Sequence, residues 1–236
     1  MTLDDKFQEN FQKRNQKNLK KADNKYLVGR TYNDYKIYID DNPNALITQM
    51  DTVYNDETTG PFIQTFKFIP SGILFALYQT EKTSSAMKDG VNTLETILGK
   101  DVFRKYVNVL LTDRGSEFYA AKDMETDMDG STRTRVFYCD PMQSGQKGSL
   151  ENNHIQLRYI LPKQTDLRSI GLTDQHSLNL VISHINSAPV EKFGGKSPLE
   201  VASFMYHDLY EKLMTFGIRE IEKDRIILKP YLLKNR

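Results

Sequence analysis

The chain has 236 residues, which is enough for one large or two small domains. Its 32 Lys and Arg residues nearly balance 31 Asp and Glu residues, so the formal net charge is only +1. One cysteine excludes a disulfide framework and a cysteine-based zinc finger, and no apolar run approaches the ~20 residues of a membrane span. We therefore expect a soluble intracellular globular protein.

Although the net charge is close to zero, the charged residues are unevenly distributed along the chain. Residues 1–30 carry eight basic and four acidic side chains, which predicts a basic, polar N-terminal arm, either solvated or in contact with phosphates. The C-terminal residues 218–236 are also basic, whereas residues 121–129 are acidic. The acidic segment lacks the Gly and Glu positions of a calcium-binding EF-hand loop, so we expect a solvated loop there.

The first half of the chain predicts three strands and a helix. The strands are expected over 45–54, 62–70 and 71–80, where β-prone residues are separated by short turn segments, as in an antiparallel meander. A helix is expected over 85–98, with Ser84 or Ser85 as its N-cap and an apolar stripe on one face.

The second half predicts two more strands and then mainly helices. The apolar run 105–113 is typical of a strand buried on both faces, and 134–140 is a fifth strand. Helices are expected over 149–160 and 173–187, and another begins at the Ser-Pro-Leu-Glu sequence 197–200 and continues through Leu213. The order of elements predicts an α/β domain with a mixed sheet.

Three carboxylates lie at the ends of these elements. Asp51 and Asp113 each follow an apolar strand segment, and parallel neighbouring strands would bring them side by side. Glu151 lies in the first turn of a helix, after the flexible loop 141–148. Oxygen ligands from three elements suit Mg²⁺ or Mn²⁺. A lone Asp after a strand is more often a turn former or helix cap, and an acid in the first turn of a helix is favoured by the helix dipole in any case.

The sequences around these acids are more specific. MDTV at Asp51, LTDRGSEF at Asp113, and FYCDP followed by SGQKGSLENNH at Glu151 together resemble the catalytic core of DDE transposases. The resemblance is to the IS30-type family and, more distantly, to retroviral integrases and other ribonuclease-H-like enzymes. There are 61 residues between the two aspartates and 37 between Asp113 and Glu151. The resemblance covers roughly residues 26 to 233.

The resemblance implies a fold and a domain organisation. The fold would be a ribonuclease-H-like mixed five-stranded sheet flanked by helices, with extra C-terminal helices. An N-terminal arm (1–28) would precede an integrase-type catalytic core (29–200), and a C-terminal helix and basic tail (201–236) would follow. The protein would be bacterial, cytoplasmic and associated with the nucleoid.

The resemblance also implies a reaction. Asp51, Asp113 and Glu151 would bind two Mg²⁺ (or Mn²⁺) ions and act as the catalytic residues of DNA strand cleavage and strand transfer. The substrates would be transposon ends and target DNA, and the enzyme would act as a homo-oligomer. The family pattern does not make Glu117 an essential ligand, and for Asp140 a structural role in a turn is favoured.

Five further residues are candidates for DNA contacts. Arg158 and His154 share a helix face with the third acid, at spacings of seven and three residues. Lys147 and Gln146 lie in the loop before this helix. Arg114 follows Asp113, at a position where members of the resembled family commonly have Asn. For His154 the alternative is a half-exposed ring with no special role, and for the loop residues it is a solvated surface.

Two alternatives to a competent transposase core remain. One is a truncated, non-mobilising DNA-binding remnant, since only about 25 residues precede the matched segment and the family usually has an N-terminal helix-turn-helix. The other is a ribonuclease-H-like nuclease that cleaves RNA–DNA hybrids. The three retained acids argue against the remnant, and the transposase-type sequences argue against the nuclease.

Overall fold

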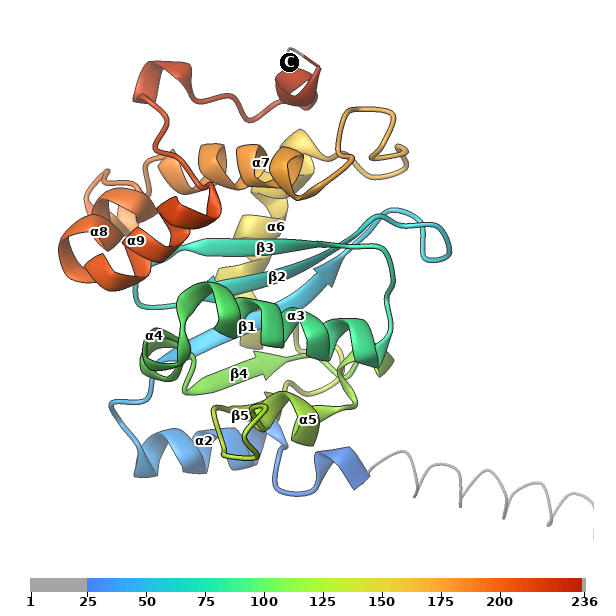
Figure 1. Cartoon of the computed structure of the whole chain (residues 1–236), viewed down its shortest axis with the longest axis vertical. Coiled ribbons are helices and arrows are strands. Elements are labelled where there is room, and N and C mark those ends of the chain that lie inside the picture. Colours follow the sequence, from blue (N-terminus) through green and yellow to red (C-terminus); the bar gives the residue numbers. More distant parts are fainter. Residues whose placement is uncertain (1–24, 235–236) are drawn as a thin grey trace, which may run out of the picture.

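The computed structural model describes residues 25–234, so nearly all of the arm predicted over 1–28 lies outside the described residues (Figure 1). The strands are β1 (Ile47–Val53), β2 (Phe62–Phe68), β3 (Leu74–Gln79), β4 (Val109–Thr112) and β5 (Arg135–Tyr138). The main helices are α2 (Tyr32–Asp41), α3 (Ser84–Leu98), α4 (Lys100–Tyr106), α5 (Ala121–Glu125), α6 (Gly148–Ile160), α7 (Gln175–Ser187), α8 (Pro198–Met205) and α9 (His207–Phe216). Among the described residues, no helix has the length and apolar character needed to cross a membrane.

The five strands form one mixed sheet in the order β3-β2-β1-β4-β5. β1, β2 and β3 pair antiparallel because short connections join them, and β4 pairs parallel with both β1 and β5. Helices α3 and α4 connect β3 to β4, and α5 lies between β4 and β5. The predicted mixed five-stranded sheet flanked by helices is therefore confirmed.

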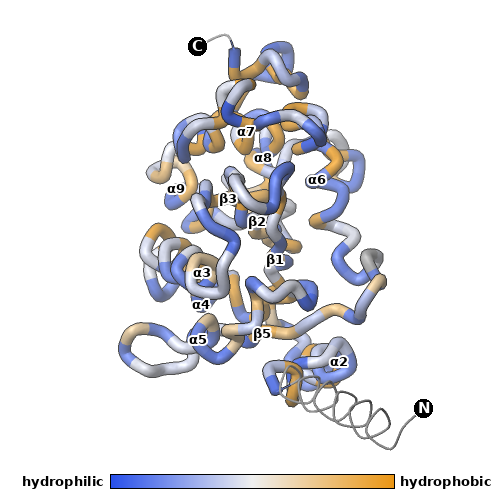
Figure 2. The backbone as a smooth tube through the Cα atoms, turned by 90° about the vertical axis from the view of Figure 1, so that its right-hand side faces the viewer, coloured by the Kyte–Doolittle hydropathy of each residue, from blue (hydrophilic) through white to orange (hydrophobic). Residues whose placement is uncertain are grey.

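Alternate residues of β1 face opposite sides of the sheet. On one side, the Thr52 hydroxyl lies 3.5 Å from the Met87 sulfur of α3. On the other side, the Gln49 side chain accepts a hydrogen bond from the Leu150 N–H of α6, at 2.9 Å. Figure 2 shows α3 and α6 on opposite sides of the strands. Asp51 shares the parity of Gln49 and therefore faces α6.

The edge strand β3 is covered by side chains of α7. The Asn186 amide accepts from the Leu74 N–H at 2.8 Å and donates to its carbonyl at 2.7 Å. The Gln175 amide does the same to the Tyr78 N–H and the Ala76 carbonyl, at 2.8 and 3.0 Å. Two amide side chains therefore replace the partner strand that an exposed edge lacks.

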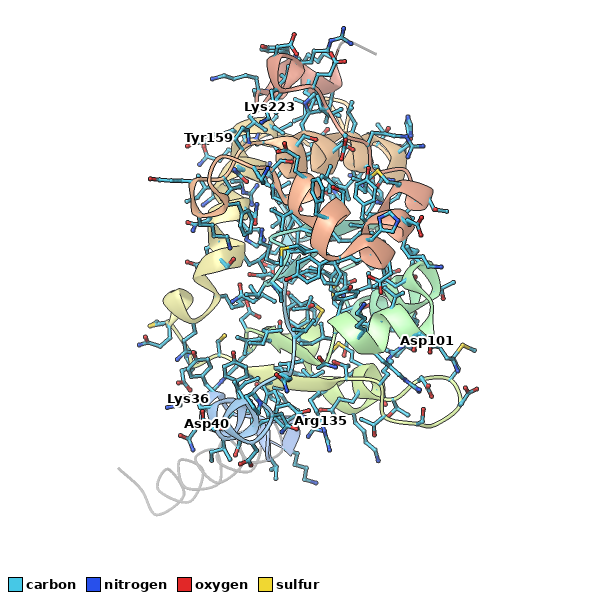
Figure 3. The ribbon with its side chains drawn as sticks, turned by 90° about the vertical axis from the view of Figure 1, so that its left-hand side faces the viewer. Lys36, Asp40, Asp101, Arg135, Tyr159 and Lys223 are labelled. Atoms are coloured by element: carbon cyan, nitrogen blue, oxygen red, sulfur yellow. The ribbon has the colours of Figure 1, made fainter. Side chains whose placement is uncertain are left out.

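Helix α2 was not predicted from the sequence. Thr31 is its N-cap and forms a capping box. No residue of α2 is buried, and the sequence accordingly has no clear apolar stripe that would predict the helix. Its aromatic side chains pack on the β5 side of the sheet, with the Tyr38 ring 5.4 Å from that of Phe137. Figure 3 shows Lys36 and Asp40 of α2 and Arg135 of β5 at the same end of the molecule.

Two predicted boundaries were wrong, and the N-cap of α3 is Thr83, not Ser84 or Ser85. The strand predicted over 105–113 begins only at Val109, because α4 continues through Tyr106. Asn108 separates the two elements: its side chain donates to the Arg104 carbonyl of α4 and accepts from the Leu46 N–H before β1. The helix predicted from 197 through Leu213 is two helices. Tyr206 is the C-cap of α8, and α9 begins at His207.

The acidic segment is not a solvated loop throughout. The Asp127 side chain is fully buried and accepts hydrogen bonds from the N–H groups of Asp129 and Ser131, each at 3.0 Å. Arg104 of α4 donates to the same carboxylate at 2.8 Å. Asp127 therefore closes the loop as a turn and attaches it to α4, which the spacing of acids alone does not reveal.

Gly90 of α3 permits a close approach to β2. A Cβ there would lie 1.8 Å from the side-chain oxygen of Gln64, which accepts from Gln79 and whose amide donates to the Met87 carbonyl. In an open helix Gly→Ala stabilises by about 1 kcal/mol, but overpacking costs about 1–3 kcal/mol. We expect Gly90→Ala to lower the free energy of unfolding in urea. The loss should shrink in a Gln64→Ala background; an undiminished loss would contradict this cause.

Lys67 of β2 should make stability depend on pH. Its side chain is 5% exposed and donates to the Gly72 carbonyl, and burial lowers its pKa to about 7, with Lys192 contributing. In the unfolded chain the pKa is about 10.4. Between these values the unfolded state binds more protons, so the free energy of unfolding should rise from pH 7 to 10 and fall as the pH decreases. Lys67→Met should remove this slope in urea titrations, whereas Lys122→Met at an exposed position should retain it.

Candidate active site

Parallel pairing brings Asp51 and Asp113 side by side. The register joins Ile47 to Val109 and Gln49 to Leu111, so paired residues are 62 positions apart. Asp51 and Asp113 have the same separation. Asp51 belongs to β1, and Asp113 directly follows β4. This is the juxtaposition of two carboxylates that the sequence predicts.

A buried lysine lies at both carboxylates. The Lys147 ammonium is 2.7 Å from an Asp51 carboxylate oxygen and 3.6 Å from one of Asp113. Lys147 ends the short 3-10 helix Ser144–Lys147 before α6, and it is only 5% exposed. Burial lowers its pKa, but Asp51 and Asp113 outweigh that effect and raise the pKa above its ordinary value. The side chain is therefore a cation held between two anions.

The same segment is attached to β1 by Gln49. Its side-chain oxygen accepts from the Leu150 N–H at 2.9 Å, and its amide donates to the Gln146 carbonyl at 3.5 Å. The Leu150 N–H is in the first turn of α6, where backbone N–H groups lack intrahelical partners. Gln49 and Lys147 therefore hold the start of α6 against the sheet.

Glu151 lies on the wall of a cleft beside the paired aspartates. The cleft has a volume of about 660 Å³ and is lined by residues of β1, α6 and the segment after α6: Thr52, Val53, Tyr54, Asn55, Glu151, His154, Ile155, Arg158, Tyr159, Lys163 and Gln164. In residues 25–234, no three His, Cys, Asp or Glu side chains are arranged to hold a metal ion. The structure thus joins Asp51 to Asp113 but does not bring Glu151 into a three-carboxylate cluster with them.

His154 is a half-buried, neutral ring. Its Nε2 lies 3.1 Å from the Thr65 hydroxyl, and Thr65 pairs with Asp51 in the sheet. Burial lowers the pKa of His154 to about 4; Lys147 and Arg158 also lower it, against the opposing effect of Asp51. The ring is therefore uncharged at neutral pH and positioned as a hydrogen-bonding group.

The basic candidates for DNA contacts are engaged within the protein. Besides the buried Lys147, Arg158 donates to the Tyr54 carbonyl at 3.0 Å and to the Asn55 side chain. Arg114 donates to the Cys139 carbonyl and the Asp140 carboxylate, each at 3.0 Å. These groups fix the walls of the site, and their role in DNA binding stays a prediction.

Asp140 also fixes the loop before α6. Gln146 donates to the Asp140 carboxylate at 3.2 Å and accepts from the Asp140 N–H at 2.8 Å. Asp140 therefore has the structural role that the sequence favoured, and Gln146 is held by it.

Glu117 is a third carboxyl group close to the aspartates. It is 7% exposed, and its pKa is raised by burial and by the charges of Asp113 and Asp51, against the opposing effect of Lys82. A Cβ at Gly115 would lie 2.6 Å from a Glu117 carboxylate oxygen and 3.1 Å from one of Asp113. In the sequence, the only sign that Glu117 lies near Asp113 is the short spacing between them, across Arg-Gly-Ser.

Sequence analysis also missed the exposed apolar side chains on the cleft wall. Ile155 and Tyr159 are 52% and 57% exposed, and both line the cleft together with Lys163. They follow Glu151 at spacings of four and eight residues, and this helical periodicity could have identified them.

Comparisons with known proteins place these features in context. No family model matches the chain. The chain is 35% identical over 92 residues to the transposase InsI of insertion sequence IS30A from Escherichia coli, covering 39% of this chain and 22% of that protein. It is 35% identical over 75 residues to the transposase of IS1086 from Cupriavidus metallidurans, covering 32% and 21%. The chain thus matches about a fifth of the length of these relatives.

Among solved structures, the catalytic core of bovine immunodeficiency virus (BIV) integrase aligns with a TM-score of 0.49 and 21% identity, over 70% of this chain and 97% of that one. The HTLV-2 integrase catalytic core aligns with a TM-score of 0.47 and 16% identity, over 66% and 94%. The sequence similarity to transposases of IS30 and IS1086 supports the predicted resemblance to the IS30-type family.

Proposed function

We propose that the protein cleaves DNA strands at the ends of an insertion sequence and transfers them to target DNA. The observation that carries this proposal is the proximity of Asp51 of β1 and Asp113, directly after the parallel strand β4, with the Lys147 ammonium between their carboxylates. The similarity to IS30 transposases supports the choice of DNA as substrate. We further propose a homo-oligomer that acts on paired DNA ends in the bacterial cytoplasm, in association with the nucleoid.

The carboxylates of Asp51 and Asp113 fit a divalent metal. Their oxygen atoms are ligands of the kind that hard cations prefer. The Lys147 ammonium is close to both carboxylates, so their charges together stabilise a cation at that position. We assign Asp51 and Asp113 as ligands of Mg²⁺ or Mn²⁺ and Glu151, from α6, as the third ligand of a two-ion site. Bound ions would activate water or a DNA 3′-hydroxyl and stabilise the leaving oxygen of the phosphodiester.

The protein groups around this site would position the DNA. Tyr159 and Lys163 expose an aromatic ring and an ammonium on the cleft wall, which suits base stacking and phosphate binding. Arg158 donates to the Tyr54 carbonyl directly after β1, and both residues line the cleft. The neutral His154 would offer a hydrogen bond to the bound strand.

We expect Asp51→Asn, Asp113→Asn and Glu151→Gln each to reduce metal-dependent cleavage at least ~100-fold, because an amide is a weaker ligand of a hard cation. The assay is gel analysis of a duplex carrying the element's terminal repeats, with Mg²⁺ and target DNA. Asp123→Asn, at an exposed position in the acidic segment, is the matched control and should cleave normally.

The same assay distinguishes the alternatives. Cleavage followed by joining to target DNA supports the transposase core, whereas preferential cleavage of an RNA–DNA hybrid without joining indicates the nuclease. DNA binding without cleavage by the wild-type protein indicates the remnant. Full cleavage by any one of the three variants would remove that acid from the assigned site.

Lys163 should contribute to DNA affinity through charge alone. We expect Lys163→Ala to weaken binding of the terminal duplex about equally for different sequences and to reduce the slope of log Kd against log salt by about 1. Fluorescence anisotropy at several salt concentrations measures both quantities. Lys212→Ala on α9, outside the residues that line the cleft, is the charge-matched control; an equal effect there would exclude the cleft as the binding surface.

A further inference from the structure

Lys147 is the least expected feature of the site. Ammonium groups are seldom buried, and this one is buried against the carboxylates of Asp51 in β1 and Asp113 directly after β4. Its third neighbour is the Met50 carbonyl of β1, at 3.5 Å. All three contacts are with oxygen atoms of the kind that bind hard cations.

The position of Lys147 is set by the chain on both sides of it. Gln49 holds the Gln146 carbonyl and the Leu150 N–H, so the ammonium reaches the aspartates from a segment fixed to β1. The adjacent Gly148 begins α6, and a Cβ there would meet no atom within 4 Å. The junction is therefore not closely packed around the backbone, although the lysine side chain is buried.

We propose that Lys147 is an internal counter-ion of the Asp51–Asp113 pair and that it competes directly with the divalent metal. This inference rests on the proposed function, because it takes the two aspartates as metal ligands. The ammonium neutralises part of the charge that would otherwise attract a divalent ion, and it occupies lone pairs that the ion needs. Metal binding therefore requires the ammonium to withdraw.

Withdrawal of Lys147 has a consequence for the loop before α6. The contacts of Lys147 with Asp51 and with the Met50 carbonyl of β1 are lost, and the two hydrogen bonds of Gln49 remain. Gln146, whose amide is held by Asp140, lies next to the displaced residue. Metal loading is thereby coupled to the freedom of the segment that enters the helix carrying Glu151.

The direct test is the affinity for Mn²⁺ in the absence of DNA, measured by isothermal titration calorimetry. Lys147→Met keeps the length of the side chain and removes its charge, so we expect a Kd at least ~10-fold lower than in the wild type. Lys147→Arg retains the charge and should bind no more tightly than the wild type. Lys122→Met, with the same change of net charge at an exposed position, should leave the Kd unchanged.

The outcomes separate this inference from the proposed function. Asp51→Asn should abolish Mn²⁺ binding; if it binds normally, the proposed metal site itself is wrong. If Asp51→Asn abolishes binding but Lys147→Met has the wild-type Kd, the metal site stands and the competition is refuted. An equal gain in Lys122→Met would assign the effect to net charge and also refute it.

A measurement on the wild type does not depend on the folding of a variant. Hydrogen–deuterium exchange reports the amides of residues 144–150, among them the Leu150 N–H held by Gln49. As Mn²⁺ saturates the protein, we expect exchange in this segment to rise at least ~3-fold, because the contact from Lys147 is lost. Unchanged or slower exchange at saturation would show that the lysine stays in place, contrary to the proposal.

Discussion

The parallel pairing of β1 with β4 is the constraint on which the site depends. Asp51 and Asp113 are far apart in sequence, and only the register of these two strands makes them neighbours. β4 is buried along its whole length, with α3 covering one face and α2 the other. A slip by one residue would turn every side chain of the strand to the opposite face, so the apolar packing fixes the carboxylates as well.

The same pairing creates an electrostatic cost. The two neighbouring carboxylates repel each other, and their charges also raise the pKa of the buried Glu117. The ammonium of Lys147 offsets that repulsion, and the carboxylates in turn make burial of the lysine tolerable. The net charge of +1 therefore says little about the partner of this protein, because local charges determine what the site binds.

Much of this arrangement could be predicted from the sequence, for identifiable reasons. The apolar segments before Asp51 and Asp113 predict strands, and a parallel pair predicts that the acids meet. The inward path of Lys147 could not be predicted, because the loop before α6 has no periodicity and a lysine there usually faces solvent. Helix α2 was missed because its contacts are made by half-buried tyrosines. Whether Glu151 completes the metal site remains a prediction.

The two ends of α6 are attached to the sheet by different kinds of contact. At its C-terminal half, Arg158 binds the Tyr54 carbonyl and the Asn55 side chain, a neutral carbonyl and an amide. At its start, Lys147 binds the aspartates as an ion pair. A divalent cation competes strongly for carboxylates and weakly for a single carbonyl or amide. The proposed metal binding would therefore loosen the Glu151 end of the helix while Arg158 keeps the other end in place, so the carboxylate proposed as the third ligand lies at the end that is released.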